Sequence, residues 1–302
     1  MQNKIEYFEP GGERLDVSAE RRCLRARLEQ HLRSSARDAV VTPVAAGTLG
    51  LCYQVEMFGK PRFLKTHLPN AKARASLAKE ADILARLYGS GFLLDRFDMT
   101  AMDGTARLCV LMPALQPLAA PMESEQVAAM TRDYRRRLEG YRPESLASSW
   151  DFDQYLARAR EALSTLSDRG LLEKASASDV GRLISYLEDG ISGQPRVLCH
   201  GDFGPRNIML SETRPLAIDW EDAFWGIAGY DYLYWLTFME NRPLLRTAAF
   251  GKTELEARTE HAILALVVVL KCYLAVRSGA YLAHSVPIQM RIDEIVDLRT
   301  RQ

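Results

Sequence analysis

One stretch of the sequence, VLCHGDFGPRNIMLSETRPLAIDWEDAF, constrains the fold of this chain more than any other. Within it Asp202 precedes Asn207 by five residues, and Asp219 follows Asn207 by twelve. Runs of β-compatible residues predict short strands at 196–202, 208–210 and 216–220, with a turn at 212–215. We therefore expect the three polar side chains on short loops at strand ends.

These groups have the chemistry that phosphoryl transfer requires. The reaction needs little covalent help from a protein, but it needs a carboxylate that orients the attacking hydroxyl group. It also needs oxygen ligands that hold Mg²⁺ on the phosphates. A base and two metal ligands at this spacing would supply both.

The motif HGDFGPRN followed by AIDWED resembles the catalytic and metal-binding loops of the aminoglycoside phosphotransferase and choline kinase family. The resemblance covers about residues 40–300 and implies a protein-kinase-like fold. It implies that Asp202 is the catalytic base, that His200 supports its loop, and that Asn207 and Asp219 bind the metal. Such an enzyme would use ATP and Mg²⁺ to phosphorylate a hydroxyl group of a small molecule.

The letters DFG at 202–204 also occur in protein kinases, but here they stand in the wrong place. In that fold the metal-binding aspartate follows the asparagine. Asp219 therefore fills this role, and the literal DFG is coincidental.

The first part of the chain offers a matching lysine and glutamate. Residues 71–88 carry apolar side chains at helical spacing, and Glu80 lies on or beside this stripe, where a carboxylate needs a partner. By the resemblance, Lys65 in RFLKT is that partner, and the pair steadies the phosphates of ATP.

Two further segments fit a nucleotide site. The loop AGTLG, with Gly47 and Gly50, has fewer glycines than a typical phosphate-binding loop, and a plain hairpin is the alternative. The segment CVLMPALQP reads as a strand that enters a linker. There Met112 would border adenine, Pro113 would offer a carbonyl and Leu115 an N–H; a strand-ending turn is the alternative.

The pattern as a whole predicts an α+β, bilobal protein-kinase-like fold. We expect an N-terminal lobe with a five-stranded antiparallel sheet and one main helix, and a mostly helical C-terminal lobe. The expected domains are a helical N-terminal extension (1–39), a nucleotide-binding lobe (40–115) and a catalytic and acceptor-binding lobe (116–302).

The acceptor is less defined than the nucleotide site. Glu221, Asp222 and Trp225 form an acidic and aromatic group just beyond the metal loop, which could hold a cationic amine. The aromatic residues within 230–235 also fit a plain core stripe, and Asp231 resembles a structural aspartate of the family. An amino alcohol, an aminoglycoside-like antibiotic, a vitamin and a sugar all stay open.

Composition narrows the class of partner. Lys plus Arg and Asp plus Glu both total 39, so no global charge favours nucleic acid. The five cysteines lack metal-ligand spacing, and the first residues lack an apolar leader, which together favour a cytoplasmic protein. The apolar run 262–270 ends at Lys271, too short to span a membrane, so we expect a buried helix.

A nucleotide-binding pseudokinase that regulates a partner protein is the alternative function. The sparse glycine loop and the N-terminal 40 residues motivate it, whereas the intact Asp202 argues against it. The oligomeric state stays open.

Overall fold

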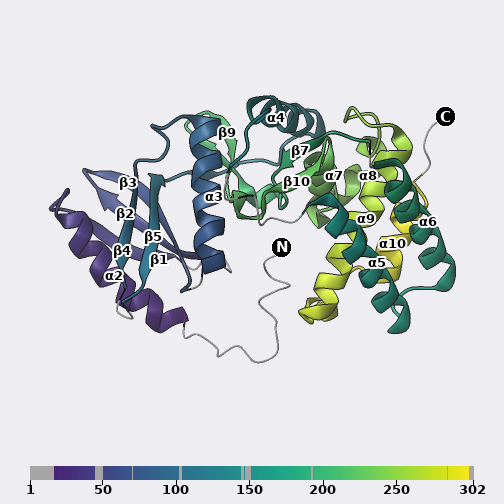
Figure 1. Cartoon of the computed structure of the whole chain (residues 1–302), viewed down its shortest axis with the longest axis horizontal. Helices are drawn as coiled ribbons and strands as arrows, with labels where there is room; N and C mark the ends of the chain where they lie inside the picture. Colours follow the sequence, from purple (N-terminus) through teal and green to yellow (C-terminus); the bar gives the residue numbers. More distant parts are fainter. Residues whose placement is uncertain are drawn as a thin grey trace. The chain divides into compact units, whose positions relative to one another are not determined.

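The computed structural model describes residues 17–44, 50–69, 71–101, 104–143, 146, 151–191, 193–283 and 285–298. The chain divides into two compact units, which are described separately (Figure 1). Unit 1 comprises the described residues within Met1–Ala119, Tyr141–Ala147 and Ile208–Asp222; unit 2 comprises those within Ala120–Gly140, Ser148–Asn207 and Ala223–Gln302.

Unit 1 is built on a five-stranded antiparallel sheet with the strand order β1-β2-β3-β5-β4. Its strands are β1 (Val40–Val44), β2 (Gly50–Met57), β3 (Lys60–His67), β4 (Asp95–Thr100) and β5 (Ala106–Pro113). The register pairs Lys65 of β3 with Cys52 of β2 and Val110 of β5. The five-stranded sheet expected from the sequence is confirmed, and Lys65 lies on its central strand.

A helix packs on each face of this sheet (Figure 1). Helix α2 (Val17–Arg33) buries Leu24, Leu28 and Leu32 in a core shared with Tyr53 and Leu64 of the sheet. Side chains of a strand alternate between its faces, so the neighbours of Leu64, Lys65 included, point to the other face. Helix α3 (Ala71–Tyr88) covers that face. The predicted N-terminal helix is thus part of the core of unit 1.

Residues 208–222 belong to unit 1, although we expected them within the second lobe. A small antiparallel sheet holds them, with the order β6-β8-β9, formed by β6 (Gln116–Pro117), β8 (Ile208–Ser211) and β9 (Arg214–Ala217). The hydroxyl of Tyr88, at the end of α3, donates to the carbonyl of Ala217 at 2.8 Å and accepts from its N–H at 2.9 Å. These bonds fix the strand that leads to Asp219.

The strand expected at 216–220 ends early. After β9 comes Asp219, whose φ of 68° lies in the left-handed region, and a 3-10 turn, η3 (Trp220–Asp222). A strand cannot continue through a residue with that φ. Asp219 therefore lies on a tight turn.

Unit 2 is mainly helical around one two-stranded antiparallel sheet of β7 (Arg196–Cys199) and β10 (Phe224–Ile227). Its helices are α4 (Ser124–Arg137), α5 (Phe152–Asp168), α6 (Lys174–Ile191), α7 (Tyr230–Leu236), α8 (Leu245–Ala248), α9 (Ala257–Arg277) and α10 (Ile288–Val296), with 3-10 turns η2 (Pro205–Asn207), η4 (Met239–Leu244) and η5 (Ala280–Ala283). The expected strand 196–202 thus stops at Cys199, which leaves Asp202 on a loop.

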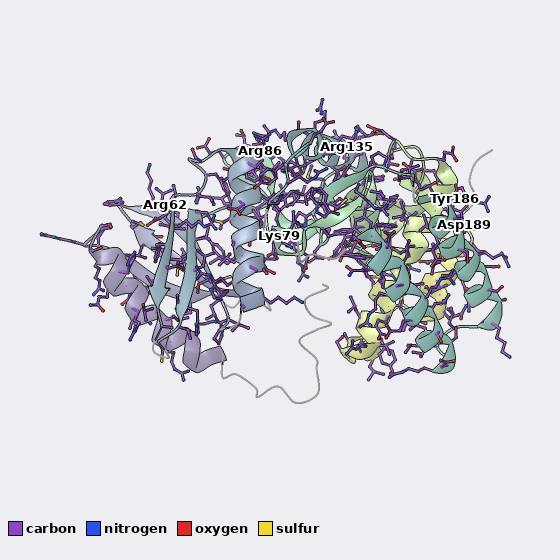
Figure 2. The ribbon with its side chains drawn as sticks, in the orientation of Figure 1. Arg62, Lys79, Arg86, Arg135, Tyr186 and Asp189 are labelled. Carbon is purple, nitrogen blue, oxygen red and sulfur yellow. The ribbon has the colours of Figure 1, made fainter. Side chains whose placement is uncertain are left out.

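Helix α9 is the core of unit 2. Among the described residues it is the one helix whose length and composition could cross a membrane, and 78% of its most apolar window is buried inside the protein. The buried helix expected around residues 262–270 is confirmed. Helix α6 packs beside it, where Tyr186 stacks under the guanidinium group of Arg258 with 4.2 Å from the guanidinium carbon to the ring centroid (Figure 2).

Candidate active site

Lys65 is the centre of an ion cluster in unit 1. Its Nζ lies 2.7 Å from Oε2 of Glu80, 2.7 Å from Oδ1 of Asp219 and 2.9 Å from Oε1 of Glu221. The lysine and both glutamates are buried, whereas the Asp219 side chain is 42% exposed. The partner that the buried Glu80 required is therefore Lys65, as predicted.

Burial and charge oppose each other in this cluster. Burial alone would lower the pKa of Lys65, but the carboxylates of Asp219, Glu221 and Glu80 outweigh it and raise that pKa well above its usual value. Burial raises the pKa of Glu221 to about 7, although Lys65 acts to lower it. Burial likewise raises the pKa of Glu80. The cluster holds an excess of negative charge, which favours a second cation.

The donor atoms of the cluster suit a hard metal ion. Carboxylate oxygens of Glu80, Asp219 and Glu221 lie within 4.8 Å of one another. Magnesium prefers such oxygen ligands. Glu80 also accepts the backbone N–H of Asp219 at 3.0 Å, which fixes the tight turn and directs the Asp219 carboxylate toward Lys65. The role of Asp219 as a metal ligand stays a prediction.

The loop that carries Asp202 lies in unit 2, and Asp231 of α7 binds its backbone. The carboxylate of Asp231 accepts the backbone N–H of His200 at 2.8 Å and that of Gly201 at 3.2 Å. Burial raises the pKa of Asp231, while His200 and these N–H groups act to lower it. Asp231 therefore has a structural role, as its resemblance to the family aspartate implied.

His200 is a buried residue that supports the same loop. Its ring is fully buried, and its Nδ1 accepts the N–H of Asp202 at 3.3 Å. It packs edge-on against Phe203, with 5.4 Å between the ring centroids. These contacts are those of a supporting residue, the role that the resemblance implied.

Asp202 and Asn207 are joined within this loop. The side-chain amide of Asn207 donates to the carbonyl of Asp202 at 2.8 Å, which leaves its Oδ1 as the atom that would ligate a metal ion. The hydroxyl of Tyr234 donates to Oδ1 of Asp202 at 2.8 Å. Arg206, between them in the sequence, is exposed.

The other predicted nucleotide residues lie in or next to the sheet of unit 1. Met112 is buried in β5, Pro113 ends that strand, and Leu115 is half-buried just beyond it. Gly50 begins β2, whereas Gly47 lies outside the described residues. Their contacts with adenine and phosphate stay predictions.

The three predicted acceptor residues are divided between the two units. Glu221 contacts Lys65, and Asp222 follows it in η3 of unit 1. Trp225 lies in β10 of unit 2, opposite Leu198 of β7. Their acceptor role stays a prediction, and the contact of Glu221 with Lys65 gives this carboxylate a second use.

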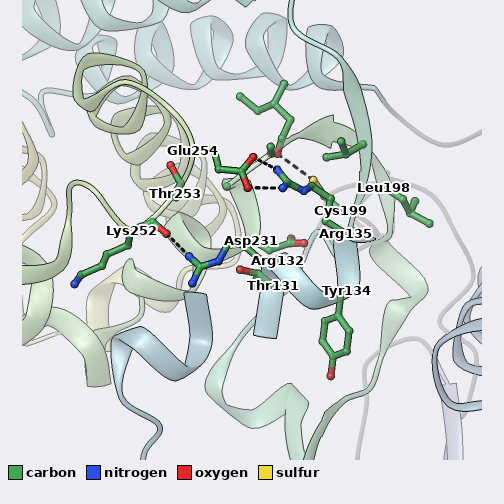
Figure 3. Close-up of a pocket in the computed structure, with 14 residues that line it drawn as sticks. Thr131, Arg132, Tyr134, Arg135, Leu198, Cys199, Asp231, Lys252, Thr253 and Glu254 are labelled. Carbon is green, nitrogen blue, oxygen red and sulfur yellow. Dashed lines mark hydrogen bonds and ion pairs between the residues drawn. The ribbon is translucent and has the colours of Figure 1, made fainter. Parts of the chain in front are cut away.

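A small pocket of about 30 Å³ lies in unit 2, between α4, β7 and the segment 252–254 (Figure 3). Asp231 and Cys199 line it, and Arg135 of α4 forms two hydrogen bonds to Glu254 across it. Burial raises the pKa of the Cys199 thiol well above its usual value, so the thiol is inert. Nothing in the lining of the pocket gives it a part in the proposed chemistry.

Comparison with known proteins identifies the family. Residues 40–264, well over half of the chain, match the model of the phosphotransferase enzyme family. The chain belongs to this family. Over 50 residues, 17% of the chain, it is 53% identical to an N-acetylmuramate/N-acetylglucosamine kinase of Pseudomonas aeruginosa. That match spans only 15% of the length of the curated relative.

Solved structures show the fold of this phosphotransferase. A thermostable mutant of aminoglycoside phosphotransferase APH(4)-Ia, in a ternary complex with AMP-PNP and hygromycin B, is 13% identical with a TM-score of 0.56, over 89% of this chain and 97% of that one. A microcompartment-associated aminopropanol kinase is 17% identical with a TM-score of 0.57, over 89% and 93%. The predicted fold class, the resemblance and, at the level of the family, the enzyme class are confirmed.

Sequence reasoning missed two groups near the predicted base. Tyr234 fits a core stripe, and no pattern in the sequence separates its hydroxyl from that of Tyr232. Lys271 stands out in the sequence only as the end of an apolar run. A charged residue within an otherwise buried helix was the one signal that could have drawn attention to it.

Proposed function

We propose that this phosphotransferase moves the γ-phosphate of ATP to a hydroxyl group of a small molecule. The observation that carries the proposal is the Lys65 cluster, in which a buried ammonium group meets the glutamate of α3 and the carboxylate of Asp219. This is the arrangement that orients phosphates and metal in kinases. Family membership supports the same reaction class.

Each residue has one task in this reaction. Asp202 orients the acceptor hydroxyl and accepts its proton as the oxygen attacks the γ-phosphorus atom and the bond from that phosphorus to ADP breaks. Lys65, held by Glu80, would contact the phosphate oxygens, and Asn207 and Asp219 would hold Mg²⁺. Bound Mg²⁺ supplies the positive charge that neutralises the transferring phosphoryl group.

The contacts of Lys65 would change when nucleotide binds. The bond to Glu80 stays, since burying that carboxylate without a partner is costly. The contacts with Asp219 and Glu221 are exchanged for phosphate oxygens, which frees Asp219 for the metal. The excess of carboxylates around one ammonium supports this exchange.

For the acceptor, we propose a sugar or an amino sugar. The identity to a kinase named for N-acetylmuramate and N-acetylglucosamine supports it, although the match is short. Glu221, one of the carboxylates expected to hold a cationic amine, is paired with Lys65. A cationic acceptor could therefore use this carboxylate only after phosphate has replaced it on Lys65.

The test is a Mg·ATP transfer assay read by mass shift. The panel contains N-acetylglucosamine, N-acetylmuramate, aminoglycosides, choline, aminopropanol and vitamins. We expect a gain of one phosphate on an amino sugar, lost in Asp202→Ala and in Asp219→Ala. Asp189→Ala, which removes an exposed aspartate on α6 (Figure 2), is the matched control and should keep full activity.

Equal rates in the parent, Asp202→Ala and Asp219→Ala would overturn the assigned roles. ATP binding without turnover on the whole panel would instead favour the pseudokinase, for which membership of an enzyme family offers no support.

All five cysteines are free thiols, which supports our further proposal of a cytoplasmic location. Cell fractionation would test that proposal.

A further inference from the structure

Helix α9 carries an ammonium group in the middle of its buried surface. Lys271 is 9% exposed, and its neighbours Leu270 and Cys272 are buried too. Burial of an ammonium group costs free energy unless other groups compensate for it. The proposed reaction gives Lys271 no task, so its burial needs another explanation.

Two aromatic rings of unit 2 enclose this ammonium group. The Nζ of Lys271 lies 3.8 Å from the centroid of the Tyr234 ring and 3.5 Å from that of Phe238, and it donates to the carbonyl of Tyr234 at 3.3 Å. Ring faces attract a cation most strongly where water is excluded. Lys271 therefore fixes both rings at once.

Both rings in turn contact the loop of the proposed base. The hydroxyl of Tyr234 donates to Oδ1 of Asp202 at 2.8 Å. Phe238 packs on Gly204, where a Cβ atom would lie 2.7 Å from the ring. The same ammonium group thus holds the loop at two points, two residues apart.

Charged groups of α10, of η4 and of the Asp202 loop act on Lys271. Burial lowers the pKa of Lys271 well below its usual value and Arg291 of α10 adds to this, whereas Asp202, Glu240 and Cys272 act to raise it. Arg291 itself is tied to the carbonyl of Thr237, at the end of α7. Burial and Arg291 thus disfavour the charged form of Lys271, and the contacts of its Nζ with the two rings and with the Tyr234 carbonyl hold it in place.

We infer that Lys271 is a positioning residue for Asp202, acting through the rings of Tyr234 and Phe238. The inference rests on the proposed function, because it assigns Asp202 the role of base. Lys271 holds Tyr234 so that its hydroxyl fixes the rotation of the Asp202 carboxylate. A carboxylate fixed in this way meets the acceptor hydroxyl without reorganisation.

The test compares Lys271→Met, Tyr234→Phe and the double variant with the parent. We expect each single variant to lower kcat about 10- to 100-fold, the range typical for loss of a hydrogen bond to a charged group, with an unchanged KM for Mg·ATP. The double variant should lose far less than the product of the two single effects, since both changes act on the contact between Tyr234 and Asp202.

The Tm and the kcat of Lys271→Met separate a positioning role from a purely structural one. Methionine replaces the buried ammonium group with an apolar chain of similar length, so the Tm of Lys271→Met should stay equal or rise while kcat falls. A fall in Tm with an unchanged kcat would overturn the inference. The matched control is Tyr232→Phe in α7, the helix of Tyr234. It removes a buried hydroxyl that donates to the carbonyl of Ala248, and it should keep the parent kcat.

A crystal structure of Lys271→Met separates this inference from the proposed function. A parent enzyme without turnover on the whole acceptor panel refutes the function. The positioning inference is then decided by geometry: it predicts that the Tyr234 hydroxyl leaves Oδ1 of Asp202 in the variant. A Tyr234 that stays within hydrogen-bond distance overturns it.

Discussion

Replacement of Lys65 by methionine tests the ion cluster of unit 1 directly. Methionine keeps most of the aliphatic packing, so the change removes mainly the ammonium group. Glu80 and Glu221 then stay buried, with side chains 3% and 10% exposed, and no ammonium group offsets the repulsion between their negative charges. Removal of one partner of a buried ion pair costs about 3–5 kcal/mol.

Two features of the cluster place the expected loss at the lower end of that range. Asp219 is partly exposed, so water screens its share of the repulsion. The pKa of Glu221 is already about 7 with the lysine in place, so this carboxylate can take up a proton when the lysine is gone. We expect a loss of about 3 kcal/mol at pH 8, against a typical total of 5–15 kcal/mol.

The sign of the pH dependence follows from the same groups. As the pH falls from 8 to 5.5, protonation of the carboxylates relieves their repulsion, so the penalty of Lys65→Met should shrink. Mg²⁺ should stabilise Lys65→Met more than the parent, because the ion replaces the missing positive charge among the three carboxylates.

The assay is urea unfolding followed by circular dichroism, with amide hydrogen exchange of β3 and α3 to report on unit 1. Lys60→Met is the matched control, since it makes the same change at an exposed position of the same strand and should stay within about 0.5 kcal/mol of the parent. Equal stability of Lys65→Met and Lys60→Met at pH 8 would refute the account of the cluster.

Three further predictions concern single side chains. Gly204→Ala should lose about 1–3 kcal/mol in urea unfolding, because its Cβ would lie 2.7 Å from the aromatic ring packed on it, whereas Gly190→Ala, in open space on α6, should not lose stability. Tyr88→Phe should lose about 1–3 kcal/mol, since both backbone groups of Ala217 lose their bonds to its hydroxyl; an unchanged urea midpoint would contradict this. Burial lowers the pKa of His261, against the effect of its bond to a carbonyl of α10, so the unfolded state binds a proton first and stability should fall as the pH drops below about 6.5. His261→Gln should flatten that slope between pH 7 and 5, and an unchanged slope would assign it to other groups.

Much of the fold could be predicted because local patterns encode it. The apolar stripe of 71–88 predicted α3 with the bounds that the structure shows. The runs of β-compatible residues around Asp202, Asn207 and Asp219 predicted that these residues lie beside the ends of short strands, which is where the structure has them. The exact end of β9 was missed, because the turn with the left-handed φ of Asp219 is held by the bond that its N–H donates to the distant Glu80.

The sequence by itself determined which chemical groups are present and in what order along the chain. It also required a cation for Glu80, because a carboxylate on an apolar stripe cannot stay unpaired. Only the tertiary structure decided that Glu221 shares that cation and that Tyr234 and Lys271 lie beside the proposed base. Lys65 and Asp219 are 154 residues apart, and no local preference encodes contacts over such a separation, since they form only when the chain packs.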